Sequence, residues 1–176
     1  EEHRSDNFET SENEGDFLHM NDSSNEQEKT KEMAGKYIEF KLGSDYYAVP
    51  IIRIKRIISS PETRAVPNTP KYFKGVIDLR GETISIIDLR LMLNIPVAQE
   101  NPEESVIIIE KDGTQTGLTV DKIHKVFNID EEKDINKAPE LTGYGLKQYI
   151  DGIYNDEGGL VLLLDVDRFL YTKKIA

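Results

Sequence analysis

The stretch Gly75–Arg90, with the sequence GVIDLRGETISIIDLR, predicts a β-hairpin and decides the fold class. Ile-Asp-Leu-Arg occurs in it twice, at 77–80 and at 87–90, and Arg80-Gly81 lies between two apolar segments. Because glycine tolerates the positive φ that a tight turn requires, we expect the turn at Arg80-Gly81. An arginine at a hairpin tip, with no His or Cys nearby, indicates recognition rather than catalysis.

The same alternation of apolar and polar residues continues on both sides of this hairpin. After Pro50 the pattern favours a short helical turn and then a strand from Ile54 to Ile58. A similar order of strands and turns occurs twice, and Asp88 and Asp165 are each placed to cap a short helix. Many short strands predict small barrels or sandwiches. We therefore expect a mainly β fold of two linked five-stranded lobes, one about 36–100 and the other about 101–176.

Composition and charge exclude several classes of protein. The 176 residues include no Cys, which excludes a disulfide framework and a thiolate zinc site. No apolar run is long enough to span a bilayer, so direct membrane insertion is not expected. The net charge is −11, of which residues 1–35 carry −8 and residues 36–176 carry −3. The body lacks a basic stripe, which argues against nucleic acid and anionic membranes as partners.

Residues 1–35 differ in composition from the rest of the chain. They are rich in Glu, Asn and Ser and contain few large apolar side chains. Such a segment cannot bury enough surface to offset the entropy lost on ordering. We expect a disordered acidic tail at 1–35, which is a solvated leader or an acidic interaction segment, and a folded domain at 36–176.

The sequence contains few signs of a catalytic site. Two of the three histidines lie in the predicted tail, and His124 has no nucleophile motif beside it. No metal-ligand spacing is present, so no metal and no cofactor are expected. Asp78 and Asp88 could form the carboxylate pair of a hydrolase, but their places beside a turn and a helix start favour structural roles. The chain is therefore not expected to be an enzyme.

The motif residues resemble those of the CheW family of bacterial chemotaxis adaptors. Asn68-Thr69-Pro70, Lys74-Gly75-Val76, Leu79-Arg80-Gly81 and Ile87-Asp88-Leu89-Arg90 match the family pattern, and the resemblance covers residues 36–176. It implies a pair of SH3-like five-stranded barrels. It also implies a non-enzymatic, cytoplasmic protein at receptor arrays, which couples the cytoplasmic tip of a chemoreceptor to the regulatory domain of the histidine kinase CheA.

The resemblance also implies which residues meet the receptor or the kinase. Matched residue by residue, the partner-binding positions are Ile54, Arg56, Gly75, Arg80, Val106 and Val126. A hydrophobic groove could accept the apolar stripe of a receptor helix, and an arginine at its rim could bind a carboxylate. Ordinary core packing is the competing interpretation for Ile54, Val106 and Val126, because strand alternation fits either face.

The chain departs from the family pattern at Asp78, at Ser85 and at Arg56. The last stands where many members carry Glu, so Arg56 and Arg80 would both be positive. We expect either that Asp78 or another acid pairs with one of them, or that the two face separate partner carboxylates.

Three alternatives stay open. The chain could be a paralogue or coupling module serving another Che-like pathway, such as twitching motility, although a standalone adaptor is favoured over a CheV-type or CheA-type protein. By fold alone it could be a small-barrel nucleic-acid-binding protein. A hydrolase built on Asp78 and Asp88 is the third.

Overall fold

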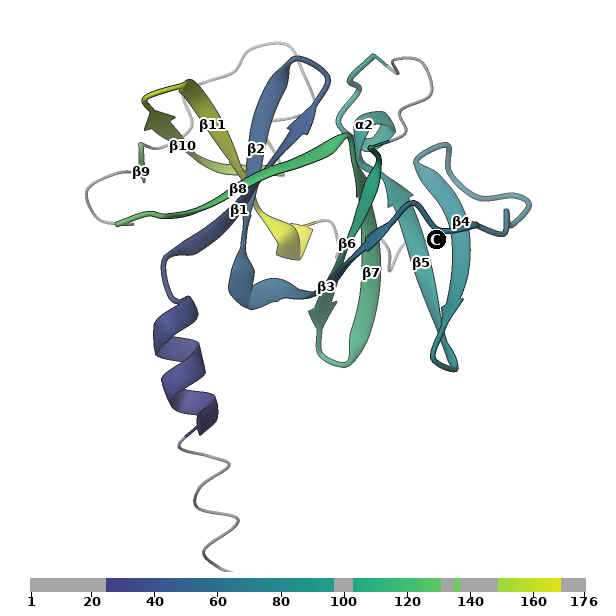
Figure 1. Cartoon of the computed structure of the whole chain (residues 1–176). Coiled ribbons are helices and arrows are strands. Elements are labelled where there is room, and N and C mark those ends of the chain that lie inside the picture. The colour runs from purple at the N-terminus through teal and green to yellow at the C-terminus, as the bar shows by residue number, and fades with distance from the viewer. Residues whose placement is uncertain (1–24, 97–102, 131–134, 137–148, 169–176) are drawn as a thin grey trace, which may run out of the picture. The chain divides into compact units, whose positions relative to one another are not determined.

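A computed structural model describes residues 25–96, 103–130, 135–136 and 149–168. The chain forms two compact units, Glu1–Ala34 and Gly35–Ala176. The second unit is mainly β, as predicted, and contains two sheets (Figure 1). Its elements are β1 (Lys36–Leu42), β2 (Asp45–Pro50), η1 (Ile51–Arg53), β3 (Ile54–Ser59), β4 (Phe73–Leu79), β5 (Glu82–Asp88), α2 (Leu89–Met92), β6 (Ser105–Lys111), β7 (Thr114–Val120), β8 (Lys122–Asn128), β9 (Ile135–Asn136), β10 (Ile150–Asp156) and β11 (Gly159–Leu164).

Part of the segment predicted to be disordered is helical. Residues 25–33 form a helix, in which the Thr30 hydroxyl donates a 2.7 Å hydrogen bond to the carbonyl of Glu26. Glu, Gln, Lys and Met are all good helix formers. The prediction of disorder rested on low hydrophobicity alone and did not include this local preference. The rest of the predicted tail, 1–24, lies outside the described residues.

The two sheets do not follow the order of the chain. One has the strand order β8-β1-β2-β11-β10-β9 and the other β3-β6-β7-β5-β4. Each half of the chain therefore gives one hairpin to the sheet of the other half: β1–β2 joins β8–β11, and β6–β7 joins β3–β5. The predicted division into lobes at about residue 100 is wrong for this reason. One sheet has six strands because the two-residue β9 pairs with β10.

Two parallel pairings hold the exchanged hairpins in place. β5 pairs with β7, with Ser85 opposite Thr116, and β2 pairs with β11, with Tyr46 opposite Val161. All the other strand pairs are antiparallel among the described residues. The repeat seen in the sequence thus returns as a repeat in the pairing.

The predicted helix caps and helical turn are confirmed. The carboxylate of Asp88 accepts a 3.2 Å hydrogen bond from the backbone N–H of Leu91, at the start of α2. Asp165 accepts one from the N–H of Asp167 at 3.1 Å. These side chains satisfy donors that have no partner inside the helix, which explains the aspartates without any catalytic role. The turn predicted after Pro50 is η1.

Three clusters of buried apolar residues make up the core. The largest lies between the sheets and combines Phe40 and Tyr47 of one sheet with Ile87 and Leu118 of the other. A second cluster belongs to the six-stranded sheet and a third to the five-stranded sheet. Because the central cluster contains residues of both sheets, neither sheet has a complete hydrophobic core on its own.

The described strands cross between the sheets at two places, and ion pairs lie at both. At η1, Arg53 donates to the two carboxylate oxygens of Asp167 at 2.8 and 2.9 Å. At the other crossing, between β7 and β8, the Asp121 carboxylate lies 3.1 Å from the guanidinium of Arg90 and accepts a 2.8 Å hydrogen bond from the N–H of Gly43. Each crossing is thus fixed to a neighbouring element.

Candidate functional site

The tip of the β4–β5 hairpin holds an arginine in a fixed place. Leu79 is opposite Glu82, so that Arg80 and Gly81 alone form the turn, with φ angles of 51° and 82°. Positive φ at both positions defines the type I′ turn, whose twist matches that of the flanking strands. The predicted hairpin with Arg80 at its tip is confirmed, and Arg80 is one of the few non-glycine residues in the left-handed region.

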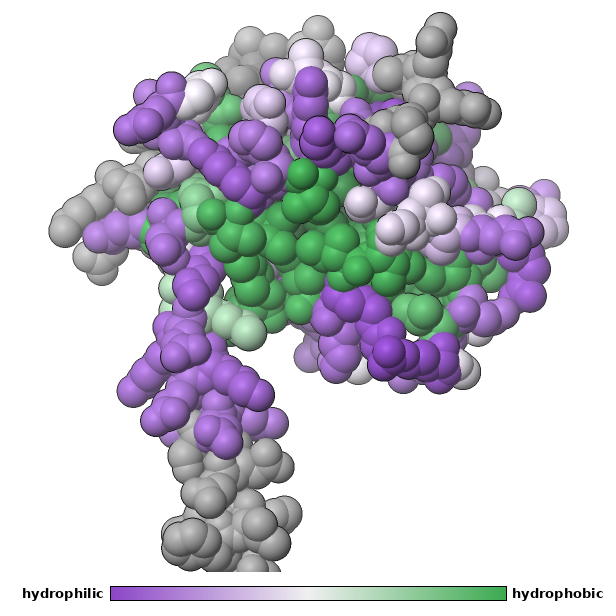
Figure 2. All heavy atoms as spheres, viewed as in Figure 1, coloured by the Kyte–Doolittle hydropathy of each residue, from purple (hydrophilic) through white to green (hydrophobic). Residues whose placement is uncertain are grey.

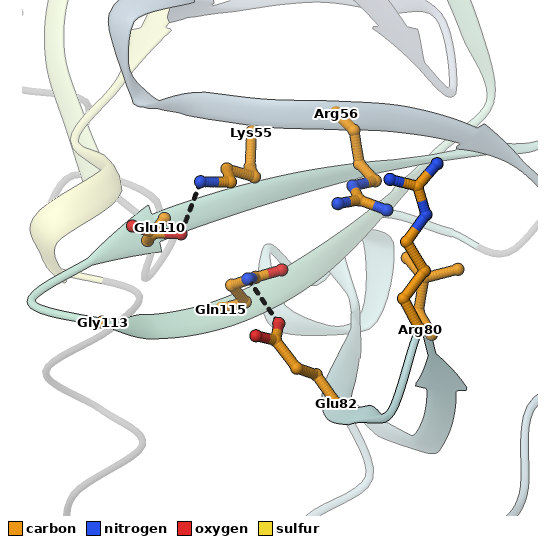
Figure 3. Close-up of a pocket in the computed structure, with 8 residues that line it drawn as sticks. Lys55, Arg56, Arg80, Glu82, Glu110, Gly113 and Gln115 are labelled. Atoms are coloured by element: carbon orange, nitrogen blue, oxygen red, sulfur yellow. Dashed lines mark hydrogen bonds and ion pairs between the residues drawn. The ribbon is translucent and has the colours of Figure 1, made fainter.

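A cavity of about 370 Å³ lies beside this tip (Figure 3). It is bounded by β3, by the β6–β7 hairpin and by the tip itself. Two of the predicted partner-binding residues line it, Arg56 from β3 and Arg80 from the β4–β5 turn. The complete lining is Lys55, Arg56, Leu79, Arg80, Glu82, Glu110, Gly113 and Gln115. We call this the arginine pocket.

The charges of the arginine pocket are only partly balanced inside the chain. Lys55 forms an ion pair with Glu110 at 3.4 Å, and the Gln115 side chain donates a 2.7 Å hydrogen bond to Glu82. Within the described part of the chain, Arg56 and Arg80 have no ion pair or hydrogen bond of their side chains. In Figure 3 their guanidinium groups extend toward each other.

Asp78 does not neutralise either arginine. Its carboxylate lies 3.6 Å from the guanidinium of Arg64 and accepts a 3.0 Å hydrogen bond from the Thr83 hydroxyl. The expectation that Asp78 pairs with Arg56 or Arg80 is therefore wrong, because its carboxylate is taken by Arg64, which precedes β4, and by Thr83, its cross-strand neighbour on β5. The second expectation, that the arginines face partner carboxylates, stays a prediction.

Gly75 and Val106 are placed inside the fold. Val106 is only 1% exposed and packs with Ile84 and Ile108 in the cluster of the five-stranded sheet. Gly75 is buried, and a Cβ at this position would lie 2.3 Å from the carbonyl oxygen of Arg64. We therefore assign these two residues to packing rather than to partner contact.

Ile54 and Val126 belong to different sheets. Ile54 is half-buried on β3 and packs against the central core, whereas Val126 is 55% exposed on β8, at the end of the six-stranded sheet. Figure 2 shows hydrophobic residues gathered across the middle of the face on which β8 and β3 lie. Two more exposed apolar side chains are Ile52 of η1 and Ile57 of β3.

The sequence prediction missed most of the pocket. Lys55, Glu82, Glu110 and Gln115 line it, and none of them was singled out. One signal was available, because the charged residues flanking the turns Arg80-Gly81 and Asp112-Gly113 must lie near the hairpin tips. What the sequence could not supply was the strand pairing: β5 with β7 brings the two tips to one place, and β3 with β6 adds Lys55 and Arg56.

His124 lies away from this pocket and has its own partners. Its ring contacts the buried carboxylate of Glu39 and lies 5.1 Å from the ring of Tyr46. Next to it, a hydrogen bond between Lys125 and Asp156 raises the pKa of Lys125 and lowers that of Asp156. Among the described residues no three His, Asp or Glu side chains are grouped so that they could hold a metal.

A comparison with protein families gives a direct match. Residues 36–174 match the family model described as "CheW-like domain". The chain belongs to the CheW family. Among similar proteins, the "Chemotaxis protein CheW" of Bacillus subtilis (strain 168) is 31% identical over 135 residues, covering 77% of this chain and 86% of that protein. The "Chemotaxis protein CheW" of Treponema pallidum (strain Nichols) is 27% identical and covers 78% and 83%.

A solved structure of the same family supports the fold. The scaffolding protein TtCheW from Thermoanaerobacter tengcongensis superposes with a TM-score of 0.70 at 27% identity, over 75% of this chain and 84% of that one. This likeness agrees with the family assignment. None of the helices in the described ranges is both long and apolar enough to cross a membrane.

Proposed function

We propose that this CheW-family chain is a non-enzymatic adaptor that couples chemoreceptor cytoplasmic tips to the regulatory domain of the histidine kinase CheA at receptor arrays. The single observation that carries the proposal is Arg80, which a type I′ turn holds at a hairpin tip without a partner for its side chain among the described residues. A fixed and unpaired guanidinium is available for contact with another protein.

The rest of the surface supports binding to helical partners. Ile52, Ile57 and Val126 are exposed on η1, β3 and β8, and apolar side chains of this kind can receive the hydrophobic stripe of a helix. The aspartates that could have served a hydrolase have structural partners, Asp78 with Arg64 and Thr83, and Asp88 with α2.

The test measures binding to both partners at once. The full chain is mixed with a soluble receptor-tip fragment and a CheA regulatory domain, and the complexes are resolved by co-sedimentation. The parent chain is expected to bring the two partners into one complex. Arg80→Ala should weaken this coupling at least about tenfold, because a charge-assisted contact contributes roughly 1.5 to 3 kcal/mol.

Two further variants show whether a loss comes from the fold. Arg80→Asn keeps a residue that favours positive φ but removes the guanidinium, so it should lose coupling with an unchanged melting temperature. Arg64→Ala removes another exposed arginine, which pairs with Asp78 outside the pocket lining, and should couple like the parent. Failure of the well-folded parent to bind either partner would contradict the proposal.

An adaptor of another Che-like pathway is the alternative. Similarity extends to "Protein PilI" of Pseudomonas aeruginosa, at 23% identity over 132 residues. Competition between the kinases of two pathways for this chain would separate the two possibilities, because the cognate kinase should displace the other.

A further inference from the structure

The arginine pocket has an unbalanced charge that only another molecule can neutralise. We propose that Arg56 and Arg80 together receive one acidic side chain, Asp or Glu, of the receptor tip, and that Arg56 makes this chain selective for an acid at that contact. The inference deepens the proposed function and rests on it for the choice of partner.

The chain's own carboxylates near the two arginines are engaged elsewhere. Of the acids beside the two arginines, Glu110 pairs with Lys55, Glu82 accepts from Gln115, and Asp78 pairs with Arg64. Two guanidinium groups that extend toward each other repel, and the repulsion falls when an anion lies between them. A carboxylate offers two oxygens, one for each guanidinium.

The charges that line the pocket call for one negative charge. Three cationic and two carboxylate side chains line the pocket, which leaves a net charge of +1. One carboxylate balances this charge. A phosphate group, with a charge near −2, would leave an excess negative charge close to Glu82 and Glu110. The lining therefore favours an acidic side chain over a phosphorylated one.

The pocket also has an apolar side chain beside the two arginines. Leu79 supplies this side chain to the pocket lining. A partner that covers this side chain would exclude water from the ion pairs, which makes them stronger than pairs in open solvent. The pocket is thus suited to an acid that is flanked by apolar residues on the partner's surface.

The experiment compares charge variants of the full chain in binding to a soluble receptor-tip fragment. Arg56→Gln removes the charge and should weaken binding about tenfold, since hydrogen bonds to charged groups contribute roughly 1.5 to 3 kcal/mol. Arg56→Glu places a like charge opposite the partner's acid and should weaken binding further. Lys122→Gln is the matched control, because Lys122 lies on β8, outside the pocket lining, and pairs with Glu103 at 3.3 Å; it should stay within about twofold of the parent.

A charge exchange identifies the acid. Each Asp and Glu of the tip fragment is replaced in turn by Lys. One of these tip variants should bind the parent chain poorly and bind Arg56→Glu well. If Arg56→Glu binds the unchanged tip as tightly as the parent does, or if no Lys variant restores its binding, the inference is wrong.

Two outcomes separate this inference from its alternatives. A parent chain that binds neither receptor tip nor CheA contradicts the proposed function, whereas normal parental binding that ignores charge at position 56 contradicts only the inference. Inorganic phosphate is the second probe, followed through the Nε–Hε NMR signals of Arg56 and Arg80. Sub-millimolar phosphate binding, with tip binding unaffected by every acid replacement, would assign the pocket to a small anion instead.

Discussion

Replacing Gly75 with alanine should destabilise the folded chain by about 3 to 5 kcal/mol. Gly75 has a φ of 146°, which side chains rarely adopt, and such strain costs roughly 1 to 3 kcal/mol. A Cβ would also lie 2.3 Å from the carbonyl oxygen of Arg64 and 2.8 Å from a methyl group of Thr63. The backbone would have to move, breaking the two 2.9 Å hydrogen bonds between Arg64 and Val76, at about 1 kcal/mol each.

Gly81→Ala is the matched control, because Gly81 also has a positive φ, 82°, but a Cβ there has no neighbour within 4 Å. It should cost only about 1 to 2 kcal/mol, the conformational part alone. Urea unfolding, followed by circular dichroism, measures both free energies of unfolding. If the two variants lost the same stability, the close approach of the Arg64 carbonyl would not be the reason for glycine at position 75. Its assignment to packing would then be wrong.

Two further predictions concern buried ionisable groups. Arg90 is 7% exposed, and Arg90→Met would leave the carboxylate of Asp121 without its cation, so urea unfolding should show a loss of about 3 to 5 kcal/mol. Arg64→Met, which breaks a pair that is mostly exposed, should lose less than about 1 kcal/mol, and equal losses would contradict this account. Burial raises the pKa of Tyr47 to about 12, so the unfolded chain, with a tyrosine pKa near 10, loses that proton first as the pH rises. Stability should therefore be intact below pH 10 and fall by up to about 2.7 kcal/mol between pH 10 and 12, and Tyr47→Phe should abolish this fall in unfolding experiments at each pH.

Local structure was predictable because short-range signals decide it. The Arg80-Gly81 turn, the helical turn after Pro50 and the Asp88 cap each depend on a few neighbouring residues, and all were predicted correctly. The assignment of hairpins to sheets was not, because alternation states which face of a strand is buried but not which strand lies beside it. Chain order suggested two successive lobes, and the parallel pairings of β5 with β7 and β2 with β11 overrule it.

The candidate site could be predicted only in part, for the same reason. The resemblance of the motif indicated both Arg56 and Arg80, and the structure does place them in one pocket. The environment of the pair could not be predicted, because it depends on Glu82, Glu110 and Lys55, which meet only after β3 has paired with β6 and β5 with β7. For Val106 and Gly75 the resemblance suggested contact residues, but burial in the folded chain decides for packing.

The two places where the chain passes between the sheets have a mechanical consequence. They are the covalent connections through which one sheet could turn relative to the other, and a line through them is the natural hinge axis of the body. Ion pairs lie at both ends of that axis, Arg53 with Asp167 and Arg90 with Asp121. A partner that twists one sheet must therefore strain these two pairs. Loosening either pair should therefore make it easier for one sheet to turn against the other.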